Sequence, residues 1–330
     1  MNKSVIVFII IGIVFIGGTL SYFITTNFSE EPPKTPIKIA LNVWSGYAYA
    51  FIAQEKGIFE KNGVDVELIL SRDYTSANQQ FNTGEVDGVF EVLTDTLFRT
   101  TEGLSSKVVH IVDYSETGDV IIGSVNTIEE LRGQTIGIEG INTFSHIFVL
   151  RAIESFGMTE GDVFFKIVFA SDVVKKLDDE VIQAGHTWEP GKSEALEKGY
   201  KVLANAGDFP YLITDVLVFN LNIIEERPDD IQKIVQSMFE ALEFLEANPD
   251  EAIRIMAELT GMSEDAMSEG LEAILMTNLD ENIKVMTPSN DPTLKNIIAE
   301  IAKFYMDRGQ ISYEPTFNDI IEPMFVKELR

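Results

Sequence analysis

The sequence lacks cysteine altogether over its 330 residues. This absence excludes disulfide bridges, iron–sulfur clusters, thiolate metal sites and cysteine nucleophiles, and it leaves no cysteine to carry a lipid anchor. Histidine is nearly as scarce: there are only His110, His146 and His186, and no two of them have the spacing of metal ligands on one helix face. The sequence therefore predicts no metal site, no cofactor and no catalytic group.

Positive charge is the second shortage. The chain has 25 Lys and Arg against 53 Asp and Glu, which gives a net charge of −28. A surface that acidic repels nucleic acid and anionic lipid headgroups, so we expect no nucleic-acid partner. The sequence also lacks a Gly-x-x-x-x-Gly-Lys-Ser/Thr phosphate loop and a Gly-x-Ser-x-Gly nucleophile elbow, and it thus carries no signature of nucleotide or ester hydrolysis.

One uncharged hydrophobic run, residues 5–24, stands apart from the rest of the chain. A helix of that length spans about 30 Å, the thickness of a bilayer's hydrocarbon core. Lys3 precedes the run and Glu30 and Glu31 follow it, so the positive-inside rule places the body of the chain outside the cell membrane. We interpret residues 1–28 as a signal anchor, a single-pass transmembrane helix; a cleaved signal peptide, giving a secreted protein, is the alternative.

Residues 29–36 contain three prolines and predict an extended linker. Beyond the linker, short hydrophobic strands alternate with helical segments, which predicts an α/β fold with mostly parallel, helix-covered sheets. The first series of expected strands comprises residues 37–41, 64–70, 88–92, 108–112 and 120–125, with helices at 49–56 and 75–83.

The alternation then restarts. A second series of expected strands comprises residues 135–138, 163–169, a strand ending near 187, 202–203 and 216–219, with a helix at 143–156. After Asn220 the pattern becomes helical, and residues 229–248 carry apolar side chains at helical spacing, which we expect in the core.

The two series predict two doubly wound lobes joined by two hinge strands. We assign residues 37–122 and 221–330 to lobe 1 and residues 123–220 to lobe 2, with hinge crossings near 123–126 and 215–220. Two crossings allow the lobes to close about a shared cleft, which is the natural ligand site.

Five short motifs then occur in the order typical of one protein family: Trp44-Ser45-Gly46-Tyr47, the run AQEKGIFEKNGVDVE at 53–67, Gly84-Glu85-Val86-Asp87-Gly88, Thr187-Trp188-Glu189-Pro190, and Glu226-Arg227-Pro228 with Ala247-Asn248-Pro249. On these motifs the chain, from about residue 37 to its C-terminus, resembles the ABC-transporter substrate-binding proteins of the nitrate/sulfonate/taurine class, which also includes binders of thiamine-pyrimidine precursors. The resemblance implies the type II periplasmic-binding-protein fold, a small-molecule solute, and permease and ATPase subunits as partners.

The sequence departs from the family pattern at Gln183, where members often have an acidic residue. Enzymes with the same resemblance synthesise the thiamine pyrimidine and carry a cysteine-rich iron site, for which a chain without cysteine gives no support. We therefore favour a solute-binding component that performs no chemistry. The alternatives that stay open are a thiamine-pyrimidine-synthesis-like enzyme and a membrane-tethered ligand sensor.

Ligands of open parallel sheets bind beyond the carboxyl ends of the strands, so aromatic and polar residues near predicted strand ends are candidates for the site. Two aromatic faces with a few polar groups suit a small planar or cationic solute. On this basis we select ten ligand-binding candidates: Trp44, Tyr47, Thr94, Asp95, Asn142, Thr143, Ser145, Trp188, Glu189 and Asp215.

Several candidates have a purely structural alternative. Asp95, Thr143 and Ser145 could cap helices instead of contacting a ligand. Arg72, which is not among the candidates, is expected in a surface ion pair with a neighbouring carboxylate. Because the candidate set is aromatic and acidic, with no clear Lys or Arg, we expect an amine-bearing or heteroaromatic nitrogen solute rather than nitrate.

Overall fold

The computed structural model describes residues 35–330. The predicted signal anchor, residues 1–28, and most of the predicted linker lie outside the described residues. Within residues 35–330, no helix combines the length and the apolar character needed to cross a bilayer.

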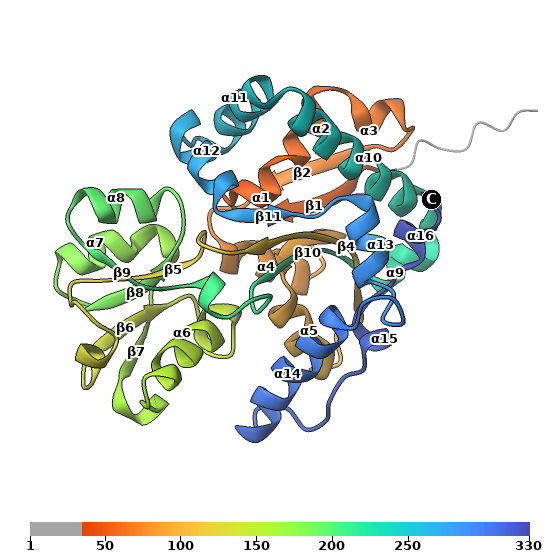
Figure 1. Ribbon diagram of the computed structural model, residues 1–330. Helices are drawn as coiled ribbons and strands as arrows, with labels where there is room; N and C mark the ends of the chain where they lie inside the picture. Colours follow the sequence, from red (N-terminus) through yellow and green to blue (C-terminus); the bar gives the residue numbers. More distant parts are fainter. Residues whose placement is uncertain (1–34) are drawn as a thin grey trace, which may run out of the picture. The chain divides into compact units, whose positions relative to one another are not determined.

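A six-stranded sheet forms the centre of the first lobe (Figure 1). β1 pairs in parallel with β2 and β3, whereas β10 runs antiparallel to β3 and β4, and β11 antiparallel to β4. The chain therefore winds outward in both directions from the β1–β3 pair, the position at which doubly wound sheets bind ligands. In the spatial order β11-β4-β10-β3-β1-β2, the strands are β1 (Ile37–Leu41), β2 (Val66–Leu70), β3 (Gly88–Val92), β4 (Ser106–Ser115), β10 (Thr214–Asn220) and β11 (Ile274–Met276).

A five-stranded sheet forms the centre of the second lobe, on the left in Figure 1. β6 pairs in parallel with β7 and β8, and β5 runs antiparallel to β8 and β9. The predicted α/β fold with two sheets is thus confirmed. In the spatial order β7-β6-β8-β5-β9, the strands are β5 (Val120–Gly123), β6 (Thr135–Ile138), β7 (Phe164–Ile167), β8 (Ala184–Thr187) and β9 (Lys201–Asn205).

The chain passes between the two sheets at residues 116–119 and 206–213. Both crossings come earlier than the expected ranges 123–126 and 215–220. β5 already belongs to the second sheet, and β10 is a central strand of the first sheet, which explains why its residues from Val216 to Phe219 are fully buried. The first lobe thus takes residues 35–115 and 214–330 and the second takes 120–205; a hinge role for the crossings stays a prediction.

Helices cover both sheets (Figure 1). The C-terminal helices return to the first lobe, where α10 and α11 pack on α2, α12 on α1, α14 on α5 and α16 on β4. The second lobe carries α6 (Phe144–Ser155), α7 (Val173–Asp178) and α8 (Gly191–Glu197). The first lobe carries α1 (Ser45–Ala48), α2 (Ala50–Glu55), α3 (Ile58–Lys61), α4 (Tyr74–Asn82), α5 (Leu93–Thr101), α9 (Leu221–Glu226), α10 (Pro228–Ala247), α11 (Pro249–Thr260), α12 (Glu264–Glu272), α13 (Leu279–Val285), α14 (Thr293–Asp307), α15 (Phe317–Ile320) and α16 (Met324–Lys327).

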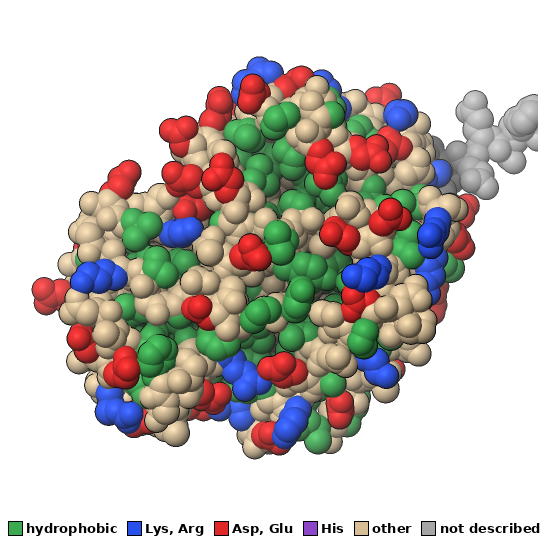
Figure 2. All heavy atoms as spheres, in the orientation of Figure 1, with side chains coloured by type: hydrophobic (Ala, Val, Ile, Leu, Met, Phe, Trp, Pro, Cys, Tyr) green, Lys and Arg blue, Asp and Glu red, His purple; other side chains and the backbone are tan. Residues whose placement is uncertain are grey.

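Helix α10 illustrates how the sequence directs this return. Pro228 begins the helix, where its missing N–H costs no hydrogen bond, and Asp229 and Asp230 in the first turn favour the positive end of the helix dipole. The apolar stripe that begins at Ile231 is buried, as predicted from its spacing. Figure 2 shows Asp and Glu side chains spread over the visible face, with fewer Lys and Arg among them.

Candidate functional site

Two adjoining cavities lie between the lobes. The outer chamber has a volume of about 250 Å³, and the inner chamber about 10 Å³, which is close to the space for one water molecule. Asn42, Tyr74 and Trp188 line both chambers, so the two share a wall. The inner chamber is lined by Asn42, Trp44, Tyr47, Tyr74, Val92, Asp119, Phe144, Trp188 and Asp215.

The walls of the outer chamber are segments that follow strands in both lobes. Residues 42–43 follow β1 and residues 72–74 follow β2 in the first lobe, while residues 187–191 include the end of β8 in the second. Carboxyl ends of parallel strands lie along one edge of a sheet, so each sheet presents this edge to the cleft. The remaining lining residues are Glu139, Ala170, Ser171, Glu194, Thr260, Gly261 and Met262.

The only two tryptophans of the chain meet in this cleft. Trp44 comes from the first lobe and Trp188 from the second, and their rings lie edge to face with centroids 6.2 Å apart. The Trp188 indole N–H donates to the carbonyl oxygen of Val43 at 3.0 Å, a hydrogen bond from one lobe to the other. The indole pair therefore joins the lobes at the boundary between the two chambers.

The motif Trp44-Ser45-Gly46-Tyr47 is shaped by this arrangement. Trp44 stands at the N-cap position of α1 in extended backbone, which turns its ring toward the inner chamber. A Cβ atom on Gly46 would overlap the Asp113 carboxylate and lie 2.7 Å from the Trp44 indole nitrogen, so the glycine leaves room for both side chains. Tyr47, one turn later, reaches the same chamber.

Asp215 lines the inner chamber, and a second buried aspartate, Asp113, lies beside it behind the chamber wall. Asp113 on β4 and Asp215 on β10 are directly opposite each other in the antiparallel register. The Trp44 indole N–H donates to Asp113 Oδ2 at 3.2 Å, and the Tyr47 hydroxyl donates to Asp215 Oδ1. Among the described residues, no Lys, Arg or His forms an ion pair with either carboxylate. Burial raises the pKa of Asp113 to about 7, and burial and the Asp113 charge raise the pKa of Asp215 well above its usual value.

A network of hydrogen-bonded side chains lies behind the cleft wall of the second lobe. Asp119 Oδ1 lies 2.8 Å from His186 Nε2, and His186 Nδ1 lies 2.9 Å from Ser145 Oγ. Ser145 Oγ in turn accepts from the backbone N–H of Glu139 at 3.1 Å. His186 is fully buried and does not reach the cleft. The hydrogen-bond network therefore positions Asp119 and Glu139.

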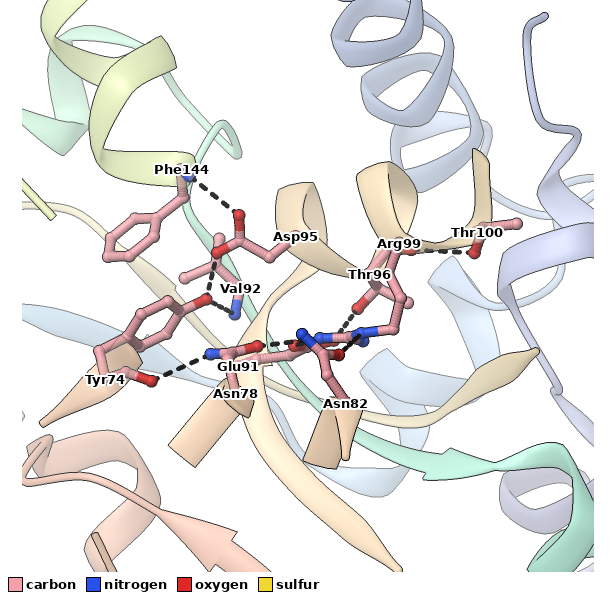
Figure 3. Close-up of polar contacts among 10 residues, drawn as sticks. All are labelled: Tyr74, Asn78, Asn82, Glu91, Val92, Asp95, Thr96, Arg99, Thr100 and Phe144. Atoms are coloured by element: carbon pink, nitrogen blue, oxygen red, sulfur yellow. Dashed lines mark hydrogen bonds and ion pairs between the residues drawn. The ribbon is translucent and has the colours of Figure 1, made fainter. Parts of the chain in front are cut away.

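Two further carboxylates make hydrogen bonds between the lobes. Asp95 on α5 accepts from the Tyr74 hydroxyl of its own lobe and from the backbone N–H of Phe144, which begins α6 in the other lobe (Figure 3). Glu139 accepts from the Thr75 hydroxyl across the cleft at 3.3 Å. Removal from water raises the pKa of both carboxyl groups to about 7.

The structure brings half of the sequence-based candidates to the chambers: Trp44, Tyr47, Trp188, Glu189 and Asp215. The other candidates do not line either chamber. Asp95 instead contacts the other lobe through Phe144, and Ser145 lies behind Glu139.

Asn142, Thr143 and Thr94 serve the backbone or the core. The Asn142 carbonyl oxygen accepts from the Tyr305 hydroxyl at 3.1 Å, and the Thr143 hydroxyl donates to the Gly140 carbonyl at 2.8 Å. The Thr94 side chain is fully buried.

Sequence reasoning missed several lining residues. Arg72 was expected only in a surface ion pair; it forms that pair with Asp73 at 2.7 Å, but it also lines the outer chamber, so the cleft does contain an arginine. Asp119, Tyr74 and Phe144 were also missed. Asp119 directly precedes β5, and Tyr74 and Phe144 begin helices α4 and α6. These positions at the ends of elements could have indicated that the three residues line the cleft.

The sequence matches a known protein family over most of the two lobes. The profile described as "NMT1/THI5 like" matches residues 44–252, a stretch that begins at Trp44 and includes both crossings. The chain belongs to the NMT1/THI5-like family. This result confirms the resemblance drawn from the five motifs.

Within this family, two curated relatives are instructive. The riboflavin-binding protein RibY of Chloroflexus aurantiacus is 26% identical over 240 residues, which span 68% of this chain and 66% of the relative, just under two thirds of its length. The yeast 4-amino-5-hydroxymethyl-2-methylpyrimidine phosphate synthase THI11 (Saccharomyces cerevisiae) is 23% identical over 220 residues, or 61% of this chain and 64% of that protein.

Solved structures share the fold of this NMT1/THI5-like chain. The ligand-binding component of an ABC-type import system from Staphylococcus aureus aligns with a TM-score of 0.75 at 18% identity, over 90% of this chain and 99% of that one. The alkanesulfonate-binding protein SsuA from Xanthomonas axonopodis pv. citri aligns with a TM-score of 0.72 at 13% identity, over 89% and 100%. These likenesses confirm a periplasmic-binding-protein fold for residues 35–330.

Proposed function

We propose that this protein is the extracytoplasmic solute-binding component of an ABC importer, which captures a small solute between its lobes and delivers it to a permease. The observation that carries the proposal is a single cleft whose walls come from both lobes and whose lobes are joined by the Trp188–Val43 hydrogen bond. A solute that contacts both walls stabilises the closed arrangement and shifts the open–closed population toward it. The fold shared with ABC import and sulfonate-binding proteins supports this reading.

The solute is an amine-bearing or heteroaromatic nitrogen compound. The outer chamber has four carboxylates, Asp73, Glu139, Glu189 and Glu194, against the single cation of Arg72. Arg72 and Asp73 neutralise each other, and Glu189 and Glu194 lie near Lys192 and Lys198, so Glu139 is left as the carboxyl group without a cation among the described residues. No unpaired cation of the chamber is left for an oxyanion. A chamber of about 250 Å³ is below the usual range for drug-sized ligands, which limits the solute to a small molecule.

Residues 1–28 anchor the protein to the cell membrane by a single-pass helix, with the lobes outside. The apolar run and its flanking charges support this assignment. Permease and ATPase subunits are the partners, and they complete the importer. Loss of the membrane-bound fraction after deletion of residues 1–28 tests the anchor.

A thermal-shift screen of the purified full-length protein tests the proposed function. The panel contains nitrate, taurine, aliphatic sulfonates, riboflavin, aminopyrimidines and polyamines. A solute at 100 times its Kd stabilises the folded state by about 2.7 kcal/mol. We expect an aminopyrimidine or an amine to give the largest shift, and we expect the shift to fall in Glu189→Gln but not in the surface control Asp178→Asn. A largest shift with nitrate contradicts the solute assignment.

The second candidate function is pyrimidine synthesis, which the yeast relative's name favours. The absence of cysteine weighs against the iron-dependent form of that chemistry. Incubation of the protein with each stabilising compound, followed by mass spectrometry of the small molecules, distinguishes the two functions. Unchanged compound supports capture, and conversion supports the enzyme. A third candidate, a membrane-tethered sensor, requires a signalling partner in place of the permease.

A further inference from the structure

Asp215 lies at the floor of the inner chamber with Asp113 opposite it on β4, and neither has a cationic partner among the described residues. Asp113 is fully buried and Asp215 is 2% exposed. One oxygen of each accepts a hydrogen bond, from Trp44 and Tyr47 respectively, but Asp113 Oδ1 and Asp215 Oδ2 are buried without any hydrogen-bond partner. Such oxygens are costly unless a proton or a cation satisfies them.

No described element around Asp113 and Asp215 supplies a cation that balances their negative charge. α1 contributes the neutral Tyr47 hydroxyl, and α4 contributes Tyr74. The first crossing contributes Asp119, another carboxylate, which is itself bonded to His186 of β8. No ion pair to Asp113 or Asp215 arises from residues 35–330.

The walls above this floor are aromatic. Trp44, Tyr47, Tyr74, Phe144 and Trp188 all line the inner chamber. Aromatic faces attract cations, and a chamber of about 10 Å³ accepts a group about the size of one water molecule. A primary ammonium group has that size, carries positive charge and brings three N–H donors.

We propose that the inner chamber binds the protonated primary amine of the solute, which Asp215 holds as an ion pair with the neighbouring Asp113 charge behind it, while the body of the solute occupies the outer chamber. This inference rests on the proposed function, since it assumes that the cleft captures an amine-bearing solute. It states that the amine end of that solute occupies the inner chamber. The shared lining by Asn42, Tyr74 and Trp188 provides the continuous path between the amine and the body.

Amine binding exchanges one cation for another. Asp113 and Asp215 lie opposite each other on β4 and β10, and the proposal assigns one proton to this carboxyl pair when no solute is bound. The incoming ammonium group replaces that proton, which leaves to solvent, and the net charge of the site stays the same. The raised pKa values of both aspartates agree with a proton held at neutral pH. Binding therefore strengthens as the pH rises through about 7, and it weakens again near about pH 10, where the amine loses its own proton.

The test compares methylammonium chloride with sodium chloride at equal ionic strength on the full-length protein. We expect methylammonium to raise the thermal unfolding midpoint more than sodium does, with a larger difference at about pH 8 than at about pH 6. Asp215→Asn and Asp113→Asn abolish the difference, whereas Asp178→Asn, which removes the same charge from the surface, keeps it. Equal shifts by both salts, or an undiminished methylammonium effect in Asp215→Asn, overturn the inference.

Calorimetry with benzylamine and its neutral analogue benzyl alcohol adds a second readout. Benzylamine binding should release about one proton, measured as the difference in heat between phosphate and Tris buffers, and Asp215→Asn should lower its affinity about 30-fold or more. Equal affinity for the amine and the alcohol overturns the inference.

The two hypotheses fail separately. If a solute without an amine binds in the screen and Asp215→Asn leaves its affinity unchanged, the ammonium site is wrong but the capture function stands. If the methylammonium effect depends on Asp215 while the stabilising compounds are chemically converted, the site stands but the importer function does not.

Discussion

Two buried acidic centres on the first sheet differ in how their negative charge is balanced. Glu91 on β3 is fully buried, and Arg99 on α5 neutralises it through a two-pronged ion pair, with Nη1 to Oε1 at 2.6 Å (Figure 3). Asn78, Asn82 and Thr96 complete the hydrogen bonds of this pair. The Asp113–Asp215 pair at the cleft has no such cation.

The difference indicates what each centre is for. The buried Glu91 serves the fold, and its charge is balanced by Arg99 of the adjacent helix α5. Around Asp113 and Asp215 the described residues supply aromatic walls and neutral donors but no ion pair, so we infer that the balancing cation comes from outside, as a proton or as part of the solute.

Arg99→Met should destabilise the protein by about 3–5 kcal/mol, because it leaves the Glu91 carboxylate buried and uncompensated. Guanidinium unfolding measures the change. The double variant Glu91→Gln/Arg99→Met should recover most of the loss, since no charge then remains. A loss below about 1 kcal/mol for Arg99→Met would mean that Glu91 is not balanced by Arg99 alone.

The pH dependence of stability should distinguish the cleft pair from the ion pair. Asp95, Asp113, Glu139 and Asp215 have raised pKa values, so the folded state holds more protons than the unfolded state between about pH 4 and pH 7. Their contribution to the free energy of unfolding is complete below about pH 4 and falls as the pH rises to about 7.

Asp215→Asn should flatten this fall by at most about 1.4 kcal/mol per pH unit, the value of one proton. The lowered pKa values of His110 and His146, about 3 and about 4, act in the opposite direction but are present in both proteins. Urea unfolding at several pH values provides the measurement. Asp162→Asn is the control, because the partly exposed Asp162 carboxyl has a pKa that hydrogen bonds from Thr159 lower, so it titrates below this window. An unchanged slope in Asp215→Asn would contradict the assignment.

Trp188→Phe should cost about 1 kcal/mol of stability, because it removes the hydrogen bond to the Val43 carbonyl but keeps an aromatic ring in the cleft. The same variant should weaken solute binding, since it frees the lobes to separate. Chemical unfolding and solute titration test the two effects. Trp44→Phe, which removes a bond within the first lobe, is the matched comparison.

Arg72→Ala should change stability by about 1 kcal/mol or less, since Arg72 is 78% exposed and its pair with Asp73 is therefore screened by water. The guanidinium midpoint measures this effect. A loss of unfolding free energy as large as that of Arg99→Met would contradict the distinction between the buried and the exposed ion pair.

The sequence predicted most of the fold because its strands are short apolar runs with clear ends. Residues 88–92 and 135–138 form strands with the bounds expected. β11 could not be foreseen: it has three residues, and its pairing with β4 joins segments about 160 positions apart. The crossings were displaced for a related reason, because an apolar run such as 214–220 fits a hinge strand and a central strand equally well.

Trp44 and Trp188 line the cleft, as expected from their positions after predicted strand ends. Asp113 was missed because it lies inside β4, where only the pairing with β10 shows that it faces Asp215. Asn142 and Thr143 were expected in the cleft because they precede a helix. The left-handed backbone at Asn142, with φ of 64°, and the bond from Tyr305 hold that half-buried segment against the distant α14 instead.

Intrinsic tryptophan fluorescence gives the most direct test of a solute-binding cleft, because the chain's only two tryptophans both line it. Titration with a compound that stabilises the protein should change the emission saturably, with one site per chain and a Kd equal to that from calorimetry. A compound that binds at one site by calorimetry but leaves the emission of both indoles unchanged would place the binding site elsewhere and contradict the cleft.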